Sequence, residues 1–277
     1  GYAADIGRLS NALQTAWDED SGYFSYTLHN TDGTLKEFLR TEAGENANKG
    51  MDGVMALVGG SCTPKQKKAL TGHIFGPQEM FTPYGITAVD QSAGYFRDNG
   101  YWNGTVWFSH QWLLWKNMLD LGLGEQAWQI ARTALEAWRT ETGATLNTFE
   151  LLQVATGRGG WFHQFGGLSA PILLWAYSYF VPGNLSAGLG TRLWGPVFAP
   201  GNSACSLHAC TEDTGGQSVL CVTLSPSSSG WRAAINGKEV PCIQRTQAAI
   251  ELMLPPGQSN LAIQLAPRRR RQNPARL

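Results

Sequence analysis

The spacing at which apolar residues recur changes along this chain, and that change limits the possible folds more than any other feature. Up to about residue 183, apolar residues recur at the spacing of an amphipathic helix. The clearest stripe lies in EQAWQIARTALEAWRTET and consists of Ala127, Ile130, Ala131, Ala134, Leu135 and Trp138. The same pattern predicts further helices near residues 3–17, 50–59, 64–74, 103–121 and 168–180.

After VPGNLSAGLG the apolar segments become short, and several of them alternate with polar residues, as in SVLCVTL, WRAAI, AIELML and NLAIQL. The segment INGKEV contains an Asn-Gly pair, which is the strongest short signal for a β-hairpin. We therefore expect residues 184–266 to form a small β-sandwich or a comparable sheet module. Residues 267–277, with the run Arg268–Arg271, are expected to be a basic disordered tail.

The composition is that of a globular protein. Apolar residues make up 43% of the 277 residues and charged residues 15%, and the formal net charge is zero. This balance favours neither nucleic acid nor an anionic membrane as a partner, and no stretch approaches the length of a membrane span.

The five cysteines form no CxxC pair, and no phosphate loop or HExxH pair is present, so neither a metal nor a cofactor is predicted. His73 and His110 are interpreted as structural or exposed.

A candidate site lies in TFELLQVATGRGGWFHQFGGLSAPILLWAYSYF. Glu150 precedes a glycine-rich loop that also carries Trp161, His163 and Phe165. Glycine lets the backbone turn tightly and approach a ligand, a carboxylate can move protons, and aromatic rings stack on the C–H faces of sugars. The segment therefore suits carbohydrate chemistry. A surface glutamate beside a flexible loop is the alternative, and composition alone favours that alternative.

Three stretches occur in an order and at a spacing that resemble a known family. They are GYFSY after WDED, then FTPYGITAVDQSAGYFRDNGYWNGTVWFSHQW, then FELLQVATGRGGWFHQFGGLS. Together they resemble the catalytic domain of family 63 glycoside hydrolases and of the related mannosylglycerate-hydrolase-type enzymes, over residues 17–183. The resemblance implies a mainly α fold in which residues 1–183 form part of an (α/α)6 six-hairpin toroid, followed by the β-sandwich module.

The resemblance also implies an activity, the inverting hydrolysis of α-linked glucosides or mannosides. In that mechanism one carboxylic acid protonates the leaving oxygen while a carboxylate activates water. By motif, the general base is Glu150. The residues expected to contact an oligosaccharide or glycoside substrate are Tyr101, Trp102, Asn103, Trp107, Trp161, His163 and Phe165. Asn103 stands where many relatives carry Arg, and Thr105 where they carry Pro.

The general acid of the family is an aspartate in a motif upstream of WDEDSGYF. We therefore expect the chain to be the C-terminal part of a longer enzyme that lacks this acid, with the missing N-terminal half as its partner. Asp52 and Asp90 are the aspartates in family-like segments and are the alternatives.

Two other classes of function compete with a glycosidase. One is a non-catalytic carbohydrate-binding or scaffold protein with the same helical fold. The other is a terpene cyclase, which is also a helical barrel rich in aromatic residues, but the DxDD and DDxxD motifs of that class do not occur in the sequence.

Overall fold

The computed structural model of the protein describes residues 2–213 and 215–268. The chain divides into two compact units. The first comprises Gly1–Leu114 and Arg132–Ile172, and the second comprises Trp115–Ala131 and Leu173–Leu277. The expected division at residue 183 stays a prediction. The expected disordered tail lies outside the described residues, apart from residues 267 and 268.

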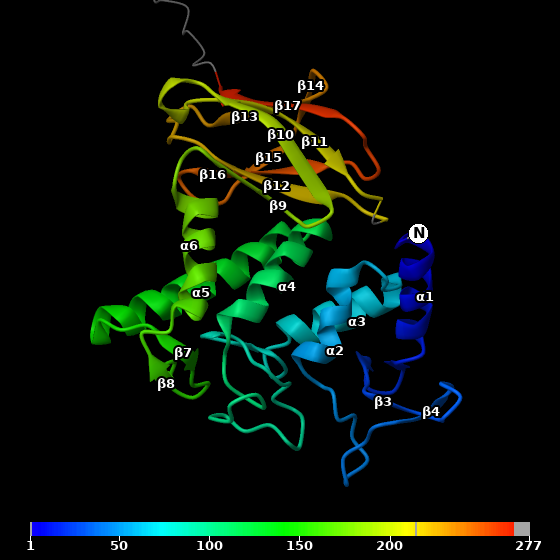
Figure 1. Cartoon of the computed structure of the whole chain (residues 1–277). Coiled ribbons are helices and arrows are strands. Elements are labelled where there is room, and N and C mark those ends of the chain that lie inside the picture. Colours follow the sequence, from blue (N-terminus) through cyan, green and yellow to red (C-terminus); the bar gives the residue numbers. More distant parts are fainter. Residues whose placement is uncertain (1, 214, 269–277) are drawn as a thin grey trace, which may run out of the picture. The chain divides into compact units, whose positions relative to one another are not determined.

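The helices of the described part follow the predicted periodicity closely (Figure 1). They are α1 (Tyr2–Gln14), α2 (Met51–Met55), the 3-10 helix η1 (Ala56–Gly59), α3 (Pro64–Phe75), α4 (Phe108–Asp120), α5 (Gly124–Thr145) and α6 (Gly166–Phe180). The start of α3 is specified locally, because Thr63 and Gln66 form a reciprocal capping box and Pro64 occupies the first helical position. Helix α4 begins later than the expected residue 103.

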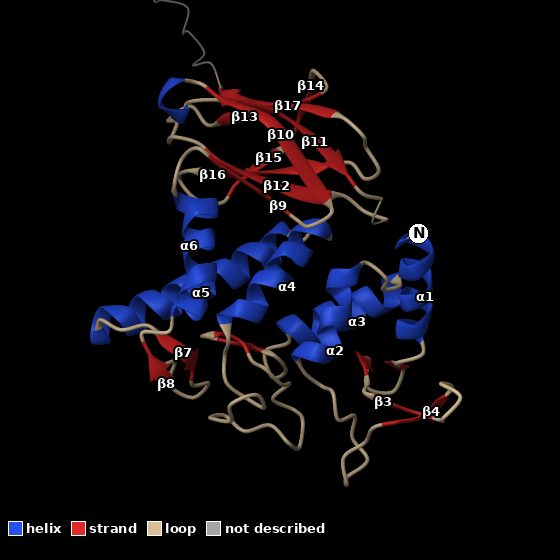
Figure 2. Ribbon diagram, in the orientation of Figure 1, coloured by secondary structure: helices blue, strands red, loops and turns tan. Residues whose placement is uncertain are grey.

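Short antiparallel pairs of strands lie between these helices in the first unit (Figure 2). They are β1 (Trp17–Asp18) with β2 (Tyr23–Phe24), β3 (Thr27–His29) with β4 (Leu35–Phe38), β5 (Phe81–Thr82) with β6 (Gly85–Ile86), and β7 (Phe149–Leu152) with β8 (Gly159–His163). Isolated bridges join Gly50 to Val89, Thr87 to Val106, and Val106 to Leu152. Through these backbone pairs, segments that are distant in sequence lie side by side in the first unit.

The expectation of a mainly α chain that begins with part of an (α/α)6 toroid was wrong. The structure is 32% helical and 30% strand. The helices were predicted well, but the segments between them are not plain loops. Their strands are two to five residues long, which is too short for a period of two to be visible in the sequence.

The second unit contains two antiparallel sheets. One has the order β10 (Thr191–Phe198), β11 (Cys205–Thr211), β17 (Leu261–Pro267), β13 (Trp231–Ile235), β14 (Lys238–Val240); the other has the order β15 (Cys242–Gln244), β16 (Ala249–Leu254), β12 (Ser218–Thr223), β9 (Asn184–Ala187). Both sheets contribute to one hydrophobic core, with Leu207 and Ile263 from the first sheet and Leu220 and Ile250 from the second.

The predicted hairpin at Asn236–Gly237 is confirmed. Strand β13 pairs with β14 through Ile235 and Lys238, so Asn236 and Gly237 alone form the turn. Both have positive φ angles, 51° for Asn236 and 78° for Gly237, as a type I′ turn requires.

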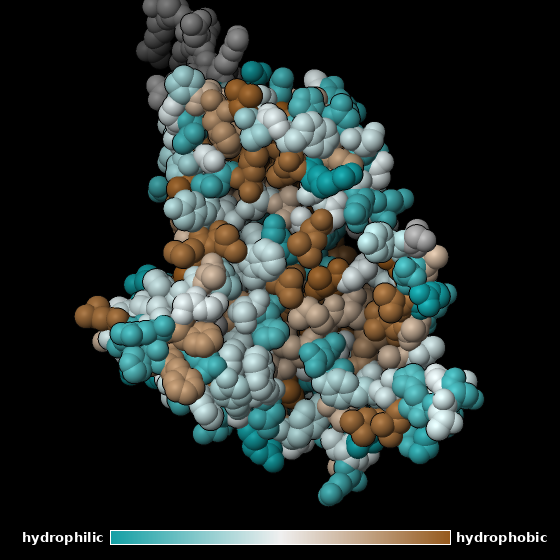
Figure 3. Space-filling view, in the orientation of Figure 1, coloured by the Kyte–Doolittle hydropathy of each residue, from teal (hydrophilic) through white to brown (hydrophobic). Residues whose placement is uncertain are grey.

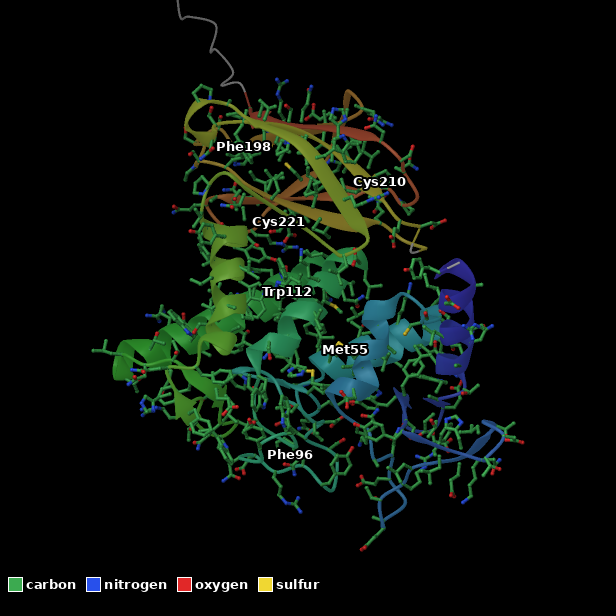
Figure 4. The ribbon with its side chains drawn as sticks, viewed as in Figure 1. Met55, Phe96, Trp112, Phe198, Cys210 and Cys221 are labelled. Carbon is green, nitrogen blue, oxygen red and sulfur yellow. The ribbon has the colours of Figure 1, made fainter. Side chains whose placement is uncertain are left out.

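Buried polar groups fix helical segments of the second unit to its sheets. Asp120, in the last turn of α4, accepts hydrogen bonds from the backbone N–H groups of Leu189 (2.7 Å) and Gly190 (3.0 Å). Cys221 lies on β12 (Figure 4), and its thiol donates to the carbonyl of Ser178 in α6 at 3.1 Å. These contacts satisfy groups that would otherwise be buried without a partner.

Within the described part of the chain, no helix is both long enough and apolar enough to cross a membrane. On the face shown in Figure 3, apolar side chains are interspersed among hydrophilic ones.

Candidate active site

Four aromatic rings of the first unit form a cluster around Tyr101. Trp102 and Trp107 stack face to face, with centroids 4.1 Å apart and an interplanar angle of 9°. Tyr101 meets Trp102, Trp107 and Trp161 edge to face, at centroid distances of 5.5, 4.9 and 4.7 Å. Edge-to-face and stacked pairs at these distances are favourable. The cluster joins the YWNGTVW motif to the glycine-rich loop that follows Glu150.

The two stacked tryptophans differ in exposure. Trp107 is buried, and its indole N–H donates to the carbonyl of Tyr101 (2.8 Å) and to the hydroxyl of Thr105 (3.1 Å). Trp102 is 52% exposed. Trp107 therefore holds the loop in place, while Trp102 offers a ring to solvent on the other side of the stack.

The loop that carries Tyr101 and Trp102 closes on itself through its backbone. The N–H of Arg97 donates to the carbonyl of Asn103 (2.9 Å), and the N–H of Thr105 donates to the carbonyl of Gly100 (3.1 Å). Gly104 packs against the backbone of Arg97, where a Cβ atom would lie 1.5 Å from the carbonyl oxygen. Only glycine fits there, which explains the glycine of the motif.

Glu150 lies on β7 at an irregularity of the ladder, because the pairing with β8 shifts between Phe149 and Leu151. Bulges of this kind redirect a side chain and are frequent beside active sites. At the end of the same strand, Leu152 exchanges backbone hydrogen bonds with Val106 (2.9 and 3.0 Å). This pairing brings the carboxylate beside the loop that carries Tyr101.

The Glu150 carboxylate has one partner among the described residues. The hydroxyl of Tyr101 donates to Oε1, and this hydrogen bond raises the pKa of Tyr101, so the hydroxyl remains a donor at neutral pH. Oε2 is buried without a hydrogen-bond partner. A buried carboxylate oxygen without a donor costs free energy unless a water or ligand hydroxyl supplies one. The carboxylate of Glu150 therefore has one acceptor position that no donor among the described residues fills.

Strand β8 and the residues after it carry the other aromatic residues expected at the site. Trp161 has a positive φ angle of 62° and is 62% exposed. Its ring packs on Tyr101, whereas His163 and Phe165 are exposed to solvent. A positive φ is unusual for a residue with a large side chain and is often associated with function.

A cavity of about 430 Å³ opens in the first unit beside Trp102. The residues that matter for its chemistry are Tyr26, Asp52, Tyr95, Trp102, Asn103 and His110. Of the predicted substrate-binding residues, Trp102 and Asn103 line this cavity; Glu150, Tyr101, Trp107, Trp161, His163 and Phe165 are not among its lining residues. The predicted site residues thus form two neighbouring groups that share Trp102.

Asp52 supplies the carboxylate of this cavity. It is exposed in the first turn of α2 and accepts a hydrogen bond from the hydroxyl of Tyr26 at 2.6 Å. Burial and this hydrogen bond raise the pKa of Tyr26 to about 12. Burial lowers the pKa of His110, although the charge of Asp52 opposes that shift. The cavity therefore presents a neutral imidazole, a phenol and a carboxylate beside an exposed indole.

Asp90, the other candidate aspartate, points elsewhere. It is 1% exposed and accepts hydrogen bonds from the hydroxyl of Tyr23 (2.7 Å) and from the backbone N–H of Ser92 (2.7 Å). It is not among the residues that line the cavity beside Trp102. It lines a second hollow with His73 and Glu79.

Sequence reasoning missed Tyr26 and Tyr95, and it assigned His110 no part in the site. Tyr26 ends the stretch GYFSY and Tyr95 lies within the second stretch, but nothing in the sequence indicates that Tyr26 meets Asp52. The loops that connect these residues bring them together, and no local spacing encodes that proximity.

Comparison with known proteins identifies the family. The model of the mannosylglycerate hydrolase MGH1-like glycoside hydrolase domain matches residues 1–166. The chain therefore belongs to this family, and the resemblance seen in the motifs is confirmed. No curated protein matches the chain significantly.

Several solved structures are similar to the chain. A family 63 mannosylglycerate hydrolase from Thermus thermophilus in complex with glucose is 22% identical, over 60% of this chain and 38% of that one, with a TM-score of 0.47. An uncharacterized conserved protein from the same organism is 23% identical over 60% and 39%, with a TM-score of 0.47. The neutral trehalase of Saccharomyces cerevisiae is 19% identical over 60% and 28%, with a TM-score of 0.44. The chain spans less than half the length of each of these structures.

Proposed function

We propose that the protein is an inverting glycoside hydrolase that acts on α-linked glucosides or mannosides, with Glu150 as the general base. The observation that carries this proposal is the environment of Glu150. It is a buried carboxylate at a β-bulge, held by Tyr101, and its other oxygen has no hydrogen-bond donor among the described residues. Membership of a glycoside hydrolase domain family supports the same conclusion.

The proposed chemistry uses Oε2 of Glu150. In an inverting mechanism the carboxylate takes a proton from the water that attacks the anomeric carbon, on the face opposite the leaving group. A carboxylic acid, which is none of the residues assigned here, donates a proton to the leaving oxygen in the same step. The Tyr101 hydroxyl, which remains protonated, fixes the orientation of the carboxylate by donating to Oε1. Oε2 is then the atom that would accept the proton from water.

The cavity beside Trp102 is the proposed sugar site. Its volume of about 430 Å³ falls within the range of ligand pockets. The exposed indole of Trp102 would stack on a pyranose, while Asn103 and the Tyr26–Asp52 pair would bind its hydroxyl groups. We assign Asp52 to sugar binding rather than to proton donation, because it is exposed and already accepts a hydrogen bond from Tyr26.

A non-catalytic carbohydrate-binding protein is the second candidate. Glu150 is not among the residues that line the cavity beside Trp102, and this separation favours binding without hydrolysis. A binding protein would take up glycosides in that cavity but release no free sugar.

The stereochemistry of the product tests the proposal. The natural protein that carries this domain is incubated with a panel of α-glucosides and α-mannosides, and the anomeric protons are followed by nuclear magnetic resonance. We expect the β-anomer to form first, before mutarotation. Initial release of the α-anomer would contradict inversion. Saturable binding of the same panel without hydrolysis would support the carbohydrate-binding alternative instead.

A further inference from the structure

A second hollow in the first unit, of about 340 Å³, shares no lining residue with the sugar cavity. Its lining includes His73 and the carboxylates of Asp20, Glu45, Glu79 and Asp90. The proposed hydrolysis assigns no role to this group, and no metal-binding motif marks it in the sequence. A concentration of carboxylates around one imidazole is a common ligand set for divalent cations.

Three of these groups converge. One ligand atom from each of His73, Glu79 and Asp90 lies within 4.8 Å of the other two. Nδ1 of His73 is 3.2 Å from Oε2 of Glu79, yet it is buried and has no hydrogen-bond partner among the described residues. Two ligands held at about 2.0–2.1 Å from one tetrahedral ion lie about 3.3 Å apart. The spacing of this pair matches two ligands of a shared cation.

Neighbouring side chains orient the ligands. The hydroxyl of Tyr23 donates to Asp90 at 2.7 Å, and the ring of Tyr23 stacks on the imidazole of His73 at a centroid distance of 4.2 Å. The backbone N–H of Ser92 fixes the other oxygen of Asp90 at 2.7 Å. Hydrogen bonds from outer residues to metal ligands have this effect in known metal sites.

The cationic side chains of the hollow are engaged with other partners. Arg40 pairs with the buried carboxylate of Asp18, with N–O distances of 2.7 and 3.1 Å. The ammonium group of Lys49 donates to the hydroxyl of Ser92 at 2.9 Å. The carboxylates of Asp20 and Glu45 add negative charge that favours a cation at the hollow.

We propose that His73, Glu79 and Asp90 bind one divalent transition-metal cation, for which Zn²⁺ is the probe. Imidazole with carboxylates suits zinc, whereas calcium and magnesium prefer oxygen ligands alone. Water would complete the coordination.

The position of the site gives the ion a structural role. The ion links α3, which carries His73, to Glu79 before β5 and to Asp90. The neighbour of Asp90, Val89, pairs with Gly50, and both line the sugar cavity. The ion would therefore hold one wall of that cavity.

Calorimetric titration of the metal-free protein with Zn²⁺ tests the proposal. We expect one saturable equivalent, and at least about 10-fold weaker binding after Glu79→Gln or His73→Phe, since loss even of an outer-shell partner costs about 10–100-fold. His73→Phe keeps a ring beside Tyr23. Asp20→Asn, which removes a charge from the same hollow but no ligand, should weaken the binding of Zn²⁺ less than either of these two substitutions. Circular dichroism verifies that each variant is folded.

X-ray absorption spectroscopy of the zinc-bound protein locates the ion. Nitrogen and oxygen neighbours at about 2.0–2.2 Å are expected, and a zinc–sulfur distance of about 2.3 Å would place the ion on one of the free cysteines and overturn the assignment. The proposal also fails if the wild-type protein shows no saturable binding of Zn²⁺. It fails as well if Glu79→Gln and His73→Phe bind Zn²⁺ as tightly as the wild-type protein does, or if Ca²⁺ or Mg²⁺ binds more tightly than Zn²⁺.

Discussion

At the scale of single residues, the two tryptophans of YWNGTVW show how neighbouring side chains of one type divide their roles. Trp107 is 5% exposed and uses its indole N–H to hold the loop backbone. Trp102 covers it and leaves its other face open. Under the proposed function, Trp102 therefore binds the sugar and Trp107 supports it.

Trp102→Ala should weaken glycoside binding by about 10-fold, equivalent to about 1.4 kcal/mol, because the lost ring contact is of the size measured for aromatic stacking. The free energy of unfolding should change little, since the ring is half exposed. Isothermal calorimetry with an α-glucoside or α-mannoside measures the binding. Trp194→Ala is a matched control, because Trp194 is also exposed and stacks on a ring, that of His208, in the second unit. An equal loss in both variants would rule out a specific role for Trp102.

Sequence motifs predicted part of the candidate site at this scale. They placed Glu150 beside an aromatic loop and named Tyr101 and Trp161, and the structure brings these three side chains together. They could not predict that Tyr26, Asp52 and His110 meet in one cavity. That meeting depends on how three separate segments pack, and no local pattern of residues encodes such packing.

At the scale of elements, the loop of residues 97–105 positions the candidate site. It contains no helix or strand and follows directly after Phe96, which is labelled in Figure 4. Its shape depends on backbone hydrogen bonds and on the close approach of Gly104 to Arg97. Any side chain at position 104 would push the loop away from that contact.

Gly104→Ala should lower the free energy of unfolding by about 3 kcal/mol or more, because the new Cβ would overlap a backbone oxygen and such strain belongs to the strongly destabilising class. Gly143→Ala is the control. Gly143 is exposed in α5 with open space around it, so alanine should stabilise the protein by about 0.5–1 kcal/mol through helix propensity. Chemical denaturation of both variants measures the difference. A Gly104→Ala protein as stable as the wild type would contradict the packing described for this loop.

The elements also show what could be predicted of the fold. Helix α5 was evident because Ala127, Ile130 and Ala134 repeat on one face and are all fully buried. The Asn236–Gly237 turn was evident because only a few residue types adopt two positive φ angles in succession. The strand pairs of the first unit, such as β5 with β6, were missed because they are held by tertiary packing and are too short to show alternation.

At the scale of the whole molecule, the chain combines a glycoside hydrolase family domain over residues 1–166 with a module of two antiparallel sheets. The sequence indicated the change from helical to strand periodicity but overestimated the helical content, because strands also occur in the first unit. The family follows from long motifs that combine glycine, aromatic and acidic residues. Under the proposed function, the identity of the sugar depends on the arrangement of the cavity, which those motifs do not specify.

The central claim is that Glu150 is the base of a hydrolase, and the turnover of Glu150→Gln tests it most directly. The substitution keeps the size of the side chain but removes its ability to accept a proton. In the natural protein that carries this domain, kcat on its best α-glucoside or α-mannoside should fall at least ~100-fold, the lower end for a positioned acid–base group, with glycoside affinity largely kept. Glu136→Gln, which alters an exposed carboxylate paired with Arg139, should leave kcat unchanged. Near-normal turnover by Glu150→Gln would contradict the account.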